Sequence, residues 1–217
     1  MKVIDFGCTA YREIWHKQKE LQDEIIQCNK KCLQNKEEFI LVGEHPSVYT
    51  IGFHGNISNL LFDEKTLEKK GCECIRIERG GDITYHGPGQ ILVYPILDLP
   101  YHSLGVKKYV NILEEAVIRL LRRYGITGER IEGATGVWID KGTILERKIC
   151  AIGIKVSRGV SIHGLALNVN TDLEWFRAIN PCGFTDKGVT SMGAEIKKNL
   201  DIAVIKHELV EILMDLL

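Results

Sequence analysis

The chain has 217 residues, of which 45% are hydrophobic and 26% are charged, and its formal net charge is -1. This composition is typical of a globular protein with a sizeable core, and we expect one domain over residues 1–217. The balanced charge excludes the basic footprint of most nucleic-acid-binding domains, and no apolar run approaches the roughly 20 residues of a membrane span.

The N-terminus and the cysteines indicate a cytoplasmic protein. The opening residues, Met1 to Phe6, lack the basic, apolar and small segments of a signal peptide and the arginines of a transit sequence. The 7 cysteines are an odd number scattered along a long chain, which is not a disulfide framework. No feature of the sequence demands a second copy, so we expect a monomer.

Hydrophobic periodicity predicts the elements of the first part of the chain. The expected elements are strands over 2–7, 39–43, 48–52 and 72–77 and helices over 9–32 and 64–70. Thr9 is the expected N-cap of the long first helix. Pro46 cannot continue a β-ladder, so we expect a turn between the second and third strands.

The rest of the chain predicts the fold class. The expected elements are strands over 91–97, 135–140, 148–156 and 161–169 and helices over 106–124 and 202–216. Gly125 is the expected end of the first of these helices. Strands outnumber helices, and several neighbours are joined by turns too short for crossovers. We therefore expect an α+β protein with a mixed, largely antiparallel sheet and flanking helices.

A glycine-rich stretch over 79–90 is the first candidate for a binding site. Four of its twelve residues are glycine, which suits a backbone that turns sharply or lets another molecule come close. Polar side chains stand between the glycines, among them Arg79, Asp82, Thr84 and His86. The stretch is either a tight β-hairpin that happens to hold a histidine or the wall of a binding cleft.

A lysine, a histidine and a cysteine form a second candidate cluster. Lys148 opens an apolar strand, which is an unusual place for a lysine if that strand is buried. Cys182 stands between a proline and a glycine, on a turn where a thiol can be presented to a substrate. A nucleophilic thiol needs its pKa lowered from about 8.5, and the charge of Lys148 or His163 is a candidate cause. These residues alone leave open whether Cys182 is catalytic.

Two other cysteine pairs are expected to pack rather than to bind a metal. Cys28 and Cys32 are four residues apart on a helix, and Cys72 and Cys74 share one face of a strand. Neither pair has a second pair nearby to complete a tetrahedral site, so we expect no metal.

Three blocks together resemble the lipoyl(octanoyl) transferase family, which has a biotin/lipoate protein ligase-like fold. They are Arg-Gly-Gly-Asp-Ile-Thr-Tyr-His-Gly-Pro-Gly-Gln at 79–90, Lys-Ile-Cys-Ala-Ile-Gly at 148–153 with Ser-Ile-His-Gly-Leu-Ala-Leu-Asn at 161–168, and Asn-Pro-Cys-Gly at 180–183 with Val-Thr-Ser at 189–191. Segments 11–18 and 43–52 also fit, so the resemblance covers nearly the whole chain.

The resemblance implies the transfer of an octanoyl group from acyl carrier protein to a lysine of a lipoyl carrier domain, with no cofactor and no ATP. The implied acceptors are the lipoyl domains of 2-oxoacid dehydrogenase complexes and the glycine cleavage H protein. Cys182 would accept the acyl group as a thioester, and Lys148 would activate it and serve as general acid and base. Thioester exchange is nearly isoenergetic, and formation of the amide makes the second step downhill.

Family analogy also implies the substrate-binding residues. The glycine-rich loop would shape the acyl pocket, and the backbone near Gly153 would donate to the thioester oxyanion. The expected binding set is Arg79, Gly80, Gly81, Thr84, Tyr85, His86, Gly87, Ile152, Gly153, His163, Gly164, Leu165 and Ala166.

Several alternatives stay open. An ATP-dependent lipoate- or biotin-type ligase would share the fold, but an adenylating mechanism has no use for Cys182. A binding module that lost its chemistry would be expected to lack the lysine or the cysteine. His163 competes with Lys148 as the base, and Cys150 shares a face with Lys148 on a regular strand, so it is a further candidate for the pocket lining.

Overall fold

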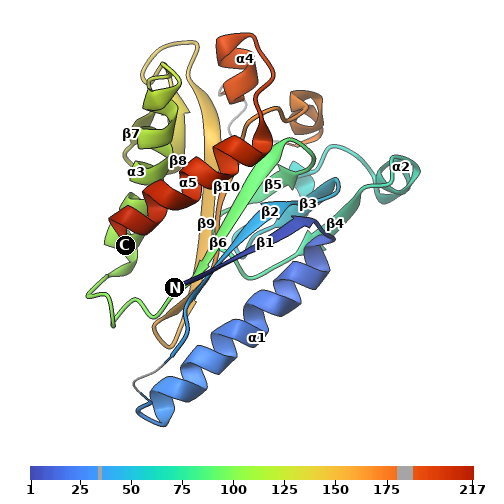
Figure 1. Cartoon of the computed structure of the whole chain (residues 1–217). Coiled ribbons are helices and arrows are strands. Elements are labelled where there is room, and N and C mark those ends of the chain that lie inside the picture. The colour runs from blue at the N-terminus through green and yellow to red at the C-terminus, as the bar shows by residue number, and fades with distance from the viewer. Residues whose placement is uncertain (34–35, 180–187) are drawn as a thin grey trace.

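The computed structural model describes residues 1–33, 36–179 and 188–217. These residues form two β-sheets with flanking helices (Figure 1). The larger sheet contains, in spatial order, β1 (Lys2–Cys8), β2 (Phe39–Glu44), β6 (Gln90–Ile96), β10 (Val160–Asn168), β9 (Arg147–Ser157), β8 (Ala134–Ile139) and β7 (Glu129–Ile131), and β11 (Gly188–Val189) also pairs with β9. The smaller sheet contains β4 (Glu73–Arg76), β3 (Val48–Ile51) and β5 (Ile83–His86) in the order β4-β3-β5.

Most strand pairs among the described residues are antiparallel. The parallel pairs are β1 with β2, β3 with β4, and β11 with β9. The remaining pairs, including β6 with β10 and β10 with β9, are antiparallel. The expected α+β class with a mixed, largely antiparallel sheet is therefore confirmed.

Helices cover both faces of the larger sheet (Figure 1). The helices are α1 (Tyr11–Lys30), α2 (Glu64–Lys69), α3 (Val106–Arg123), α4 (Met192–Ile196) and α5 (Ile202–Leu216), with 3-10 turns η1 (Ile57–Asn59) and η2 (Leu173–Ala178). Helix α1 packs against β6 and β10, whereas α3 and α5 pack together on the opposite face. None of the helices in the described residues is long and apolar enough to cross a bilayer.

Strand β6 shows how the sequence divides its side chains between these two faces. Ile91 and Val93 lie in the core under α3 and α5, whereas Leu92 and Tyr94 lie in the core under α1. Successive side chains of a strand point to opposite faces, so one apolar run supplies both cores. Burying each such side chain contributes about 1.5–3 kcal/mol.

The helix ends agree with the sequence at one helix and differ at another. Gly125 follows α3 with a φ of 72°, as expected for a residue that ends a helix. The expected N-cap of α1 at Thr9 is wrong. Ala10 is the N-cap residue and provides no side-chain hydrogen bond, while the hydroxyl of Thr9 donates to the carbonyl of Phe6. The helix begins at Tyr11, so Thr9 lies before the N-cap position and its hydroxyl bonds back to β1.

Candidate functional site

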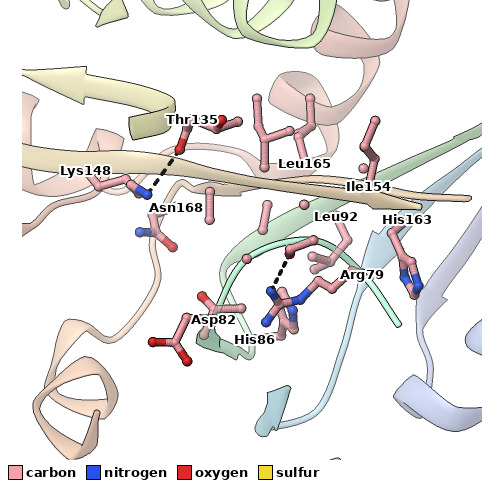
Figure 2. Close-up of a pocket in the computed structure, with 18 of the residues that line it drawn as sticks. Arg79, Asp82, His86, Leu92, Thr135, Lys148, Ile154, His163, Leu165 and Asn168 are labelled. Carbon is pink, nitrogen blue, oxygen red and sulfur yellow. Dashed lines mark hydrogen bonds between the residues drawn. The ribbon is translucent and has the colours of Figure 1, made fainter. Parts of the chain in front are cut away.

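A cavity of about 470 Å³ opens where the glycine-rich segment passes over strands β9 and β10. Lys148 lies at one end of this cavity and His163 at the other (Figure 2). Arg79 and His86 lie on the facing wall, which the glycine-rich segment 79–90 supplies. The hairpin alternative for 79–90 is wrong, because β5 belongs to the smaller sheet and β6 to the larger.

Most of the expected binding residues meet at this cavity. Those that line it are Arg79, Gly80, Gly81, Thr84, His86, Lys148, Ile152, Gly153, His163, Gly164, Leu165 and Ala166. Tyr85 and Gly87 do not line it. The side chain of Tyr85 alternates to the other side of β5, where its ring stacks on Trp175 at a centroid distance of 5.4 Å. Cys182 lies outside the described residues.

The glycine-rich loop approaches β9 closely. The amide of Gly80 donates to the carbonyl of Ile154 at 2.9 Å. A Cβ on Gly153 would lie 2.8 Å from the carbonyl oxygen of Gly80, and a Cβ on Gly52 would lie 2.3 Å from that of Gly81. Side chains at these positions would push the loop away from the sheet, so this wall of the cavity depends on glycine.

Arg79 places a fixed positive charge behind the loop. Arg79 is only 8% exposed. Its guanidinium donates to the carbonyl of Thr50 at 2.6 Å, to the Thr50 hydroxyl at 2.9 Å and to the carbonyl of Gly80 at 3.0 Å. A buried charge is stable only when such partners replace water. The guanidinium therefore holds β3 and the loop together.

A directed chain of hydrogen bonds continues from Thr50. The amide nitrogen of Gln90 donates to the carbonyl of Tyr85 at 3.1 Å and to Asn168 Oδ1 at 2.8 Å, so Gln90 Oε1 is an acceptor. It accepts from His86 Nδ1 at 2.7 Å. His86 Nε2, 3.2 Å from the Thr50 hydroxyl, then accepts the hydroxyl hydrogen. Burial, reinforced by the Arg79 charge, lowers the pKa of His86 to about 3, so the ring is neutral.

The same chain reaches the strand segment beside Lys148. Asn168 Nδ2 donates to the carbonyl of Thr190 at 3.0 Å. The amide of Thr190 in turn donates to the carbonyl of Lys148 at 2.9 Å, and Val189 pairs with Lys148 in the sheet. Residues from four separate parts of the sequence are thus fixed to one another around one end of the cavity.

A β-bulge in β9 turns Lys148 toward the cavity. Val137 is opposite Cys150 and Trp138 is opposite Lys148, so the register shifts between these two pairs. The ammonium of Lys148 donates to the carbonyl of Thr135 at 3.2 Å and lies 4.5 Å from the centre of the Trp138 ring. The ring face attracts the cation.

The bulge also separates Cys150 from the cavity. Cys150 is fully buried in the core under α3 rather than in the cavity lining. Burial raises the pKa of its thiol far above the usual range. The shared face expected for a regular strand is therefore wrong here, and Cys150 is a packing residue.

His163 has an unusual backbone and a neutral ring. Its φ is 58°, its exposure is 1%, and its amide donates to Gln18 Oε1 at 2.7 Å. Burial lowers the pKa of the ring to about 3, with a further contribution from the Arg79 charge. Its partner in the sheet is Ile154, six residues along β9 from Lys148, which corresponds to about 20 Å of strand. His163 is thus a weak base far from Lys148.

A third histidine, His45, lies beside His86, with ring centroids 6.4 Å apart. The residue is fully buried, with Nδ1 2.6 Å from the carbonyl of Thr9 and Nε2 3.0 Å from the hydroxyl of Tyr94. Burial lowers the pKa of His45 to about 4.

Sequence reasoning missed three residues near Lys148. Thr135 and Trp138 were expected only as part of a strand, and Glu114 only as part of a helix. The bulge that brings the first two to Lys148 has no signal in the hydrophobic pattern. A charged residue among the apolar positions of α3 was a signal for Glu114.

A family model described as the lipoyl protein ligase A/B catalytic domain matches residues 12–214. The chain belongs to this family. An octanoyltransferase from Bacteroides fragilis (strain YCH46) is 49% identical over 211 residues, which cover 96% of this chain and 95% of that protein. Such relatives confirm the resemblance predicted from the motifs, and the chain is an enzyme of the octanoyltransferase class.

Solved structures confirm the fold. A bipartite lipoate protein ligase from Thermoplasma acidophilum aligns with a TM-score of 0.66 at 17% identity, covering 99% of this chain and 82% of that one. A biotin protein ligase from Aquifex aeolicus aligns with a TM-score of 0.53 at 12% identity, covering 100% of this chain and 68% of that one. The expected biotin/lipoate protein ligase-like architecture is therefore confirmed.

Proposed function

We propose that the chain moves an octanoyl group from acyl carrier protein to a lysine of lipoyl carrier domains, through a thioester on Cys182. The acceptors are the lipoyl domains of 2-oxoacid dehydrogenase complexes and the glycine cleavage H protein. The names of the relatives support octanoyl transfer as the activity. We further propose that residues 1–217 act as one catalytic domain, as a cytoplasmic monomer.

One observation carries the proposal. Gly188 and Val189 pair with Arg147 and Lys148, and Cys182 precedes Gly188 by six residues in the sequence. Six residues span at most about 20 Å, so the length of this segment allows Cys182 to approach the Lys148 ammonium. A cation near a thiol favours the thiolate, which is the form that attacks a thioester.

The proposed chemistry has two acyl transfers. The Cys182 thiolate attacks the carbonyl of octanoyl-acyl carrier protein, and the carrier thiolate leaves and takes a proton from the Lys148 ammonium. The acceptor lysine then attacks the Cys182 thioester as a neutral amine. Lys148, now neutral, removes the proton from the nitrogen as the amide forms, and the Cys182 thiolate leaves.

The cavity wall suits the acyl chain. Leu92, Ile152 and Leu165 offer apolar surface along it, and Gly153 and Gly164 keep it open. An octanoyl chain has six methylenes, whose burial contributes about 5 kcal/mol at roughly 0.8 kcal/mol each. Gly153 lies five residues from Lys148 along β9, about 16 Å of strand, so we assign its backbone to the acyl wall rather than to the oxyanion.

The test is the mass of the intact protein after incubation with octanoyl-acyl carrier protein in the absence of ATP. We expect one added octanoyl group that hydroxylamine removes and that is absent from Cys182→Ala. Lys148→Arg should lose most transfer activity, because a permanent cation cannot act as a base. No adduct without ATP, together with ATP-dependent attachment of free octanoate or lipoate, would instead indicate a ligase.

A variant at His163 separates the two candidate bases. If Lys148 is the base, His163→Gln should keep the pH dependence of transfer. If Lys148→Arg is nearly as active as the wild type and His163→Gln is inactive, the base is His163.

A further inference from the structure

Glu114 is a buried carboxylate in the middle of α3 that the proposed transfer does not use. The residue is 6% exposed, and its neighbours Leu113 and Val117 belong to the hydrophobic core. A carboxylate in such a place is costly unless it is paired and hydrogen-bonded. The hydrogen-bond partners of Glu114 therefore show why a carboxylate is kept at this buried position.

Glu114 has two partners. Its Oε1 accepts the backbone N–H of Gly136 at 3.0 Å, and its Oε2 accepts from Arg130 Nε at 3.1 Å. Arg130 also binds Glu115 at 2.8 Å, so the two carboxylates share one guanidinium. Only Glu114 of this pair contacts Gly136.

The contact to Gly136 leads directly to Lys148. The N–H of Gly136 and the C=O of Thr135 belong to one planar peptide group. The N–H donates to Glu114, and the C=O accepts from the Lys148 ammonium at 3.2 Å. A carboxylate and an ammonium thus bind opposite ends of the same peptide, which polarises it in the direction that strengthens both bonds.

The conformation at Gly136 shows that this peptide is specially oriented. Its φ is 125°, and a Cβ there would lie 2.5 Å from the carbonyl oxygen of Cys150 and 3.4 Å from Cε of Lys148. The backbone therefore leaves the regular strand conformation beside the lysine side chain, at a place where only glycine fits. At this irregular position the N–H of Gly136 is bound by Glu114.

We propose that Glu114 is a positioning residue for Lys148, acting through the 135–136 peptide. It turns the carbonyl of Thr135 toward the cavity, and this carbonyl holds the Lys148 amine at the end of the cavity. This inference rests on the proposed function, in which Lys148 is the general acid and base.

The charge of Glu114 also acts on the proton of Lys148. A negative charge behind the peptide favours the ammonium over the neutral amine. Among the described residues, the other charged or titratable groups around these elements include Glu115 on α3, Arg130 on β7, and Arg147 and Cys150 on β9. Arg147 itself pairs with Asp140, which follows β8, at 2.5 Å and with Glu195 on α4 at 2.6 Å. Arg130 reduces the effect of Glu114 on Lys148 but does not remove it, because Oε1 faces the peptide.

The test compares Glu114→Gln with Glu115→Gln. Both variants remove one carboxylate that binds Arg130, but only the first changes the partner of Gly136. Competitive labelling of amines with a limiting acylating reagent, read by mass spectrometry of the Lys148 peptide, gives the pH at which this amine becomes reactive. For Glu114→Gln we expect that midpoint to fall by about one pH unit, from a Coulomb interaction across one peptide at an effective dielectric constant of about 20.

Kinetics supply the second readout. We expect Glu114→Gln to lower kcat for transfer about tenfold, with KM for the donor within about twofold, since a misplaced catalytic amine slows chemistry rather than binding. Glu115→Gln should keep the wild-type values in both measurements. Wild-type labelling and wild-type kcat in folded Glu114→Gln would overturn the inference.

A measurement on the wild-type protein keeps the inference testable if Glu114→Gln does not fold. The amide resonance of Gly136 should move at alkaline pH together with the loss of the Lys148 proton, and a resonance that stays constant would refute the coupling. Labelling and resonance shifts do not depend on octanoyl transfer. A wild-type protein that shows both but forms no acyl adduct would therefore refute the proposed function and leave the positioning role intact.

Discussion

Three buried neutral histidines predict a steep loss of stability in mild acid. Burial lowers the pKa of His45 to about 4 and the pKa values of His86 and His163 to about 3. In the unfolded chain a histidine has a pKa of about 6.5. As the pH falls below about 6.5, the unfolded state therefore binds protons that the folded state does not, and stability decreases.

The size of the effect follows from these pKa values. Each histidine contributes a slope of up to about 1.4 kcal/mol per pH unit, so three contribute about 4 kcal/mol per unit between pH 6 and pH 4. Integration from pH 6.5 to pH 5 gives a loss of about 5 kcal/mol. That loss equals the whole free energy of unfolding of a marginally stable domain, so the protein should unfold near pH 4–5.

Urea unfolding curves at several pH values between 7 and 5 measure this slope directly. His45→Gln should reduce it by about a third, because one of the three contributions is lost. The matched control is His207→Gln, whose side chain is 75% exposed and therefore hydrated in both states. If the wild-type free energy of unfolding changed by less than about 1 kcal/mol between pH 6.5 and pH 5, the three rings would not be buried as neutral groups.

Two further changes test the backbone and the hydrogen-bond chain. Thr50→Val should cost about 1–3 kcal/mol of unfolding free energy, because His86 Nε2 loses its donor and the Arg79 guanidinium loses an acceptor, and Thr50→Ser should restore most of it; equal stability of the Val and Ser variants in urea would mean that the Thr50 hydroxyl does not link Arg79 to His86. Gly164→Ala places a Cβ 2.1 Å from the carbonyl oxygen of Val93 and should cost at least about 2 kcal/mol, as thermal or urea unfolding will show. Gly105→Ala is its control, since a Cβ there meets nothing within 4 Å; a similar loss in both variants would mean that the close approach to β6 is not the cause.

The sequence predicts helices better than it predicts their ends. The apolar spacing placed one helix over 106–124 and another over 202–216, and the structure has Val106–Arg123 and Ile202–Leu216. These stripes must face a core wherever they occur, so local pattern decides them. The capping role expected of Thr9 is wrong because the helix begins one residue later than that role requires, at Tyr11, so that Ala10 occupies the N-cap position.

Strand partners and the bulge lie outside what local pattern encodes. The alternation of apolar and polar residues along a strand shows which side chains share a face, but it does not show which strand pairs with which. The sequence therefore did not predict that β3, β4 and β5 form a separate small sheet. Most of the expected pocket residues meet at the cavity because the motifs are specific. The opposite placement of Lys148 and Cys150 and the partner of Glu114 depend on contacts between segments far apart in the sequence, which the local pattern does not give.

The direction of the hydrogen bonds from Arg79 to Thr190 restricts how these positions can change during evolution. Gln90 must accept from His86 at one end and donate to Asn168 at the other, so glutamate, nearly the same size, would satisfy only the first neighbour. A replacement at one position is then tolerated only after a matching replacement at the next. Homologous sequences should accordingly vary here in groups rather than singly, and the order of donors should survive even where the residues themselves differ.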